Sequence, residues 1–150
     1  MRKAMLLLAI IGLASTLWAA DPFEGKWKEN VAKAKMATPN KSQTVVFTAQ
    51  ENGLKLVADW VDASGQSGHV TWSARFDGKD NPSTGSPNAD TIAIKRINTN
   101  TFSELFKKAG KEVLTARLVV SKGGKTLTRT TKEKNAKGQE VTSIYVFEKQ

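Results

Sequence analysis

The sequence predicts an all-β protein, an antiparallel up-and-down β-barrel of about eight to ten strands preceded by a signal-peptide helix. Short runs rich in valine, threonine and aromatic residues recur along the chain. Tight turns separate them, and Asn52-Gly53 supplies the positive φ values that a hairpin needs. Beyond the first twenty residues no long helical pattern interrupts the series. Together these observations predict a meander of strands.

The amino terminus, residues 1–20, has the pattern of a cleaved signal peptide. Arg2 and Lys3 precede a long apolar run, and Ala19 and Ala20 provide the small residues expected before a cleavage site. An uncleaved anchor is the alternative, but the run is shorter than the ~20 residues of a membrane span. We therefore expect a secreted or periplasmic bacterial protein that meets a membrane only during export.

The remainder, residues 21–150, has the length of one domain. The chain contains no cysteine, which in an exported protein favours the bacterial envelope or secretion without disulfides. The formal charge of +9 falls to +7 when Arg2 and Lys3 are removed. Because the lysines are scattered rather than clustered beside aromatic residues, we expect a solvated surface and no nucleic-acid partner. We also expect a monomer. Anionic envelope polymers remain open as partners.

About nine strands are predicted by the turn spacing. They lie around Lys26–Val31 and at Ser42–Gln50, Leu54–Val61, His69–Phe76, Thr91–Ile97, Thr101–Lys108, Glu112–Ser121, Thr126–Lys134 and Gln139–Glu148. Two segments stand apart. Glu29–Ala37 has helical propensity over barely two turns and is either a lid or a continuation of the first strand. Lys79–Asp90 is polar, contains two prolines and is predicted to be a long loop.

A barrel is favoured over a sandwich because several strands do not separate apolar from polar residues. In Glu112–Ser121, Arg117 shares one face with valines, while Ala116 and Leu118 share the other. A dry sandwich core would be more uniformly apolar on one face. Closure also removes exposed sheet edges.

The segment directly after the signal peptide contains Gly25-Lys26-Trp27. It resembles the Gly-x-Trp opening of the lipocalin and fatty-acid-binding (calycin) superfamily. The resemblance implies that Trp27 plugs one end of the barrel and that Gly25 lets the backbone pass close by. An ordinary core tryptophan is the alternative, and both make Trp27 structural. Exported bacterial lipocalin-like proteins of unknown function are the nearest in type.

The last strand is similar to that of the intracellular fatty-acid-binding proteins, in which an Arg-x-Tyr pair holds the ligand carboxylate. Tyr145 falls on the tyrosine position, but Ser143 stands at the arginine position. The resemblance implies that Arg117 matches another inward arginine of that family. Arg129 also stands mid-strand, as an anion anchor or in an internal pair with Glu104, Glu112 or Glu133.

Little in the sequence indicates catalysis. His69 is the only histidine and the chain has no cysteine, so no Cys–His pair can form. Metal ligands do not converge in the sequence. Asp77, Asp80 and Asp90 are assigned to turns rather than to calcium. No phosphate-binding loop or dinucleotide fingerprint is present. We expect no enzyme activity, no cofactor and no metal.

Two functions remain. The first is a binding protein for a small hydrophobic or amphipathic ligand, with Arg117, Tyr145, Arg129 and Trp72 as candidate contacts. The second is a structural or interaction protein of the cell envelope, with a barrel filled by side chains and a basic surface. A cavity of roughly 300 Å³ or more lined by aromatic residues would favour the first.

Overall fold

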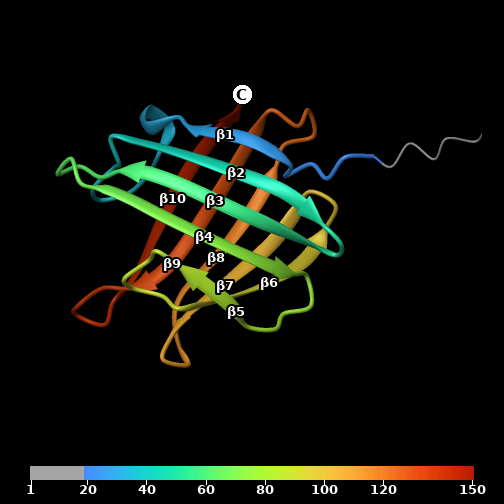
Figure 1. Cartoon of the computed structure of the whole chain (residues 1–150). Helices are drawn as coiled ribbons and strands as arrows, with labels where there is room; N and C mark the ends of the chain where they lie inside the picture. Colours follow the sequence, from blue (N-terminus) through green and yellow to red (C-terminus); the bar gives the residue numbers. More distant parts are fainter. Residues whose placement is uncertain (1–18) are drawn as a thin grey trace, which may run out of the picture.

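The computed structural model describes residues 19–150, so all but the last two residues of the predicted signal peptide lie outside it. Ten antiparallel strands form one closed barrel (Figure 1). They are β1 Gly25–Glu29, β2 Ser42–Gln50, β3 Gly53–Val61, β4 Ser67–Arg75, β5 Asn81–Thr84, β6 Thr91–Asn98, β7 Thr101–Lys108, β8 Lys111–Val120, β9 Thr126–Lys134 and β10 Glu140–Lys149.

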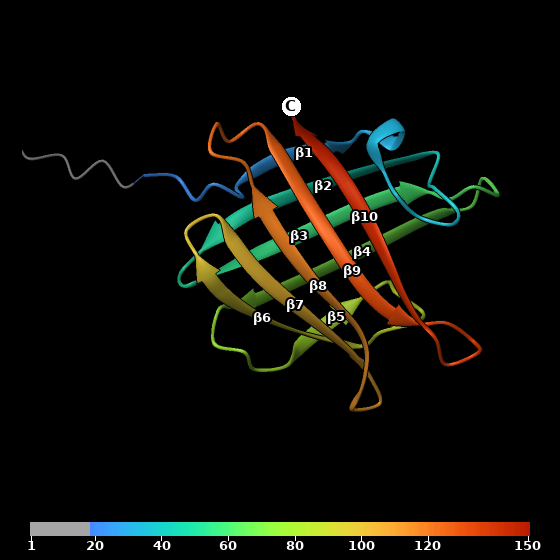
Figure 2. The same ribbon diagram turned by 180° about the vertical axis from the view of Figure 1, so that it is seen from behind.

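Each strand pairs with the next along the chain, and β1 closes the barrel by pairing with β10. The predicted all-β class, the up-and-down order and closure are therefore confirmed. Figures 1 and 2 show β2–β4 on one side of the barrel and β8–β10 on the other, with directions that cross steeply. Every strand therefore has a neighbour on both sides, although β5 meets β4 and β6 through only two residue pairs each.

The one strand that the sequence did not predict, β5, lies inside Lys79–Asp90. The prediction that this whole segment is a loop was therefore wrong. β5 is short, and Pro82 lies within it opposite Thr91. Proline lacks the amide hydrogen that a ladder needs, and it is tolerated in strands that pair weakly. Polar composition concealed a strand that makes only two residue pairs on each side.

The connection from β1 to β2 contains one 3₁₀ turn, η1 (Val31–Lys33). The amide of Lys35 donates to the carbonyl of Ile144 at 2.8 Å, and the amide of Ile144 donates back to Lys35 at 2.8 Å. Neither sequence interpretation of Glu29–Ala37 describes this segment fully, because β1 ends at Glu29, the 3₁₀ turn η1 follows, and Lys35 alone returns to pair with β10 through an isolated bridge. Within residues 19–150 no helix is long and apolar enough to span a membrane.

One end of the barrel is filled by aromatic side chains. Trp27 is fully buried, and its indole Nε1 donates to the carbonyl of Phe23 at 2.8 Å. The rings of Phe23 and Phe102 meet edge to face with centroids 4.6 Å apart. Gly25 has a φ of +123°, a conformation that side chains disfavour. This end is therefore packed, and we call it the closed end.

The segment before β1, residues 19–24, lies against the closed end. The guanidinium of Arg96 on β6 pairs with the carboxylate of Asp21 and lies 4.0 Å from the ring centroid of Phe76.

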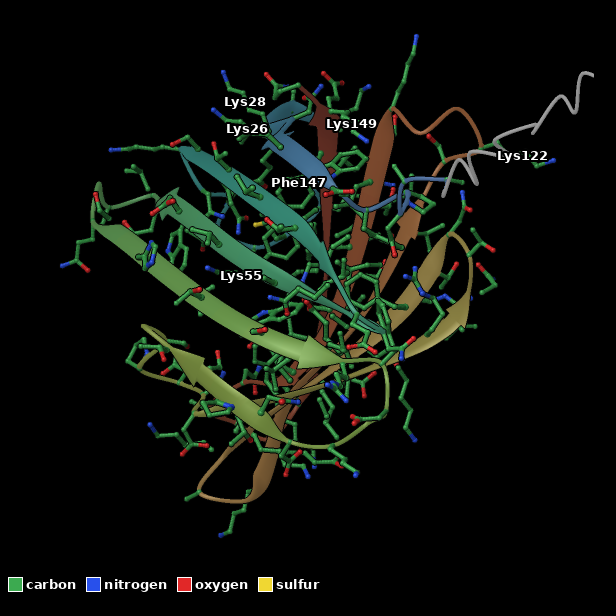
Figure 3. All side chains as sticks on the ribbon, turned by 45° about the vertical axis from the view of Figure 1, so that its right-hand side comes forward. Lys26, Lys28, Lys55, Lys122, Phe147 and Lys149 are labelled. Carbon is green, nitrogen blue, oxygen red and sulfur yellow. The ribbon has the colours of Figure 1, made fainter. Side chains whose placement is uncertain are left out.

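Outside the barrel, strand alternation points lysines into solvent: Lys26, Lys28 and Lys55 are exposed, whereas Phe147 is buried (Figure 3). The basic charge thus lies on the outer wall, as the scattered lysines predicted.

Candidate functional site

The opposite half of the barrel encloses a cavity of about 320 Å³. Six aromatic side chains contribute to its wall: Phe47, Trp60, Trp72, Phe106, Tyr145 and Phe147. The phenylalanines that fill the closed end, Phe23, Phe76 and Phe102, do not line it. This volume lies within the range of small-molecule sites. The barrel is therefore not filled by side chains throughout.

The cavity floor is apolar because alternate residues of neighbouring strands face inward at the same level. Phe47 on β2 pairs with Leu56 on β3, which pairs with Trp72 on β4. Phe147 on β10 and the leucines Leu118 and Leu127 complete this level from the other side. All six are almost completely buried. The floor can receive an apolar group at little cost in desolvation.

The cavity mouth is polar. Its wall there is formed by Gln43 at the start of β2, by Glu133 near the end of β9, and by Asn40, Ser86 and Asn88 from the connections at that end. The Trp60 ring also lies at this level, against Gly68, where an added Cβ would come within 2.1 Å of the indole. Apolar below and polar above, the cavity is itself amphipathic.

An ion pair lies along one wall of the cavity and spans β8. Nε and Nη2 of Arg129 on β9 each lie 2.9 Å from Oε2 of Glu104 on β7. The Glu104 side chain is 1% exposed and that of Arg129 is 20% exposed. The two strands are separated by β8, where Ala116 lies opposite Glu104. The small alanine leaves room for the pair to pass over β8.

Two aromatic rings flank this pair. The Arg129 guanidinium carbon lies 6.0 Å from the ring centroid of Phe106 and 5.7 Å from that of Tyr145, which is opposite Arg129 in the β9–β10 ladder. Burial raises the pKa of the Tyr145 hydroxyl, opposed by the charge of Arg129 and reinforced by Glu133 and Glu29. The hydroxyl thus stays protonated at neutral pH and can donate a hydrogen bond.

Beside the mouth, β1 ends in a buried carboxylate. Oε2 of Glu29 accepts a hydrogen bond from the Asn40 amide at 3.4 Å, whereas its buried Oε1 has no partner. Burial raises the pKa of Glu29, and the bond from Asn40 acts against this rise. Because Asn40 also lines the cavity, this contact joins the β1–β2 connection to the site.

Three of the four predicted contact residues, Trp72, Arg129 and Tyr145, line the cavity. Arg117 does not. It is exposed on the outer wall, because its neighbours Ala116 and Leu118 are buried on the inner face of β8 and side chains alternate along a strand. The prediction that Arg117 anchors a ligand inside the barrel was therefore wrong. Ser143, at the family's arginine position, is buried.

The remaining polar candidates have local roles. His69 contacts Asp59 at 2.7 Å, and both side chains are more than half exposed. Oδ1 of Asp77 accepts from the Lys79 amide at 2.9 Å, and Oδ2 of Asp90 accepts from the Ala109 amide at 3.0 Å. Among residues 19–150 there is no group of three or more His, Cys, Asp or Glu side chains arranged to hold a metal ion.

No known protein family and no curated protein matches this chain in sequence. A solved structure does resemble it: zebrafish ileal bile acid-binding protein, crystallised with cholic acid. The TM-score is 0.52 at 8% sequence identity, over 86% of this chain and 99% of that chain. At this identity the likeness shows the fold alone, a calycin-like closed barrel of antiparallel strands.

Proposed function

We propose that this chain is an exported, non-catalytic binding protein that carries a small hydrophobic or amphipathic ligand inside its barrel. One observation carries the proposal: a cavity of about 320 Å³ with six aromatic side chains in its wall, in a barrel whose other end is packed. A packed interior would have favoured the envelope interaction protein instead. The crystallised bile acid-binding protein, with cholic acid in its complex, supports this choice by analogy of fold.

The two levels of the cavity suit an amphipathic molecule. An apolar tail on the floor would lose its contact with water against Phe47, Leu56 and Trp72, and each buried methylene contributes about 0.8 kcal/mol. A polar head group at the mouth would remain beside amide, hydroxyl and carboxylate groups. The ion pair between Arg129 and Glu104 lies between these levels, and its two opposite charges already neutralise each other.

Binding of the uncharged dye N-phenylnaphthylamine to protein produced from the full chain and recovered after export tests this proposal. Fluorescence should rise to saturation at one dye per protein. Ala58, a small buried residue of the cavity wall, offers a way to block the site. Ala58→Phe should abolish the signal while circular dichroism remains that of a β protein.

The matched control is Thr48→Phe, which adds the same ring on the exposed outer face of β2. It should bind the dye as the original chain does. Equal binding by the Ala58→Phe variant would place the dye outside the cavity and contradict the proposal. Absence of saturable binding by the folded original chain would do the same.

A further inference from the structure

The charge inside the cavity is opposite in sign to that of the protein. The chain carries a formal charge of +9, yet none of the described residues that line the cavity is a lysine. Its charged lining consists of Arg129 and two carboxylates, Glu104 and Glu133. The lining thus carries one negative charge in excess, while the lysines lie on the outer wall.

The only cation of the lining is already engaged. Arg129 directs two of its nitrogen atoms at one oxygen of Glu104, whose side chain is 1% exposed. An anionic head group that recruited Arg129 would place a second negative charge beside this buried carboxylate, or leave Glu104 without its partner. Either arrangement is unfavourable because the Glu104 side chain is almost completely buried. The pair therefore disfavours a carboxylate ligand.

The mouth carries a second carboxylate that has no such partner. Inward positions of β9 alternate from Leu127 through Arg129 to Glu133, which places Glu133 about 13 Å further along β9 than Arg129, in the direction of the mouth. No ion pair among residues 19–150 involves Glu133. Tyr145 on the neighbouring strand β10 and Trp60 on β3 also line the cavity. Carboxylates and aromatic faces attract cations.

We propose that the cavity selects amphipathic molecules with a cationic head group, such as a long-chain amine, and discriminates against the corresponding acid. The tail lies on the apolar floor, and the ammonium group lies at the mouth beside Glu133. This inference rests on the proposed function, because it specifies the ligand class of the same cavity. It reverses the preference that an arginine–tyrosine clamp would give.

Competition for bound N-phenylnaphthylamine at about pH 7 tests the inference with three molecules of equal chain length: dodecylamine, dodecanol and dodecanoic acid. The protein is again produced from the full chain. Exchanging attraction for repulsion at a partly exposed site is worth about tenfold in affinity, so the amine should displace the dye at about tenfold lower concentration than the acid. The alcohol should fall between them.

Glu133→Gln should weaken dodecylamine by roughly three- to fivefold and leave dodecanol unchanged. Glu112→Gln is the matched control, because it removes the same charge from an exposed residue of β8 outside the cavity lining. It should change neither.

If dodecanoic acid displaced the dye at the lowest concentration of the three molecules, the inference would be overturned and the proposed function would stand. An unchanged ratio of amine to acid affinity in Glu133→Gln would overturn it as well. If the dye itself does not bind, the proposed function fails, and the ligand class fails with it.

Discussion

The ion pair between Arg129 and Glu104 gives a prediction whose magnitude follows from burial. Arg129→Met would leave the Glu104 carboxylate, 1% exposed, without its partner. Removing one partner of a buried pair costs about 3–5 kcal/mol. Because the Arg129 side chain is 20% exposed to a cavity that admits water, we expect the lower end, about 3 kcal/mol.

The reverse change, Glu104→Leu, should cost less. It leaves a guanidinium that still contacts the faces of Phe106 and Tyr145 and can be hydrated from the cavity. We expect about 1–2 kcal/mol. The double variant removes both charges together, so its cost should lie well below the sum of the single costs.

Urea unfolding, followed by tryptophan fluorescence, measures the free energy of unfolding of all three variants. Arg117→Met provides the control, because Arg117 is exposed on the outer wall, and it should leave the free energy of unfolding nearly unchanged. Additive single costs in the double variant would refute the reasoning, since they would show that the two side chains do not interact. So would a cost for Arg117→Met as large as that for Arg129→Met.

Three further predictions concern other parts of the chain. Trp27→Ala should lower the free energy of unfolding by about 3–5 kcal/mol, because a fully buried indole is lost; a urea titration showing less than ~1 kcal/mol would contradict its role at the closed end. Burial raises the pKa of Glu29 above 4.5, so the folded state binds this proton more tightly than the unfolded state and stability falls as pH rises through that region. Glu29→Gln should therefore gain thermal stability over the original chain as pH increases from about 4 to 7, and a pH-independent difference would argue against this linkage. We predict that the chain is exported and cleaved before Asp21, which mass spectrometry of the recovered chain would verify or contradict.

The strand pattern could be predicted from the sequence because turns and side-chain alternation are local properties. Nine of the ten strands were expected close to their observed bounds. β5 escaped prediction because its composition is that of a loop. The isolated bridge at Lys35 depends on main-chain bonds to Ile144, which lies more than a hundred residues further along the chain. The local helical propensity is realised only as the single 3₁₀ turn η1.

The candidate site was predictable only in part, since alternation defines two faces but does not say which faces inward. Arg117 and Arg129 occupy equivalent mid-strand positions in the sequence, yet only Arg129 faces the cavity. The partner of Arg129 was one of three glutamates considered, and the choice of Glu104 depends on strands that are not neighbours. Glu29 was not among the predicted residues, although strand alternation places it on the same inner face of β1 as the buried Trp27.

We propose that a ligand occupies the cavity in the half of the barrel opposite the closed end. The tryptophans of residues 19–150 report directly on whether it does. Trp60 and Trp72 line the cavity, whereas Trp27 is fully buried at the closed end. Nuclear magnetic resonance of nitrogen-labelled protein resolves each indole N–H, and dodecanol is a suitable uncharged titrant. We predict saturable shifts of the Trp60 and Trp72 signals and an unchanged Trp27 signal. Shifts confined to Trp27, or no shift of any indole at saturating dodecanol, would contradict binding in the cavity.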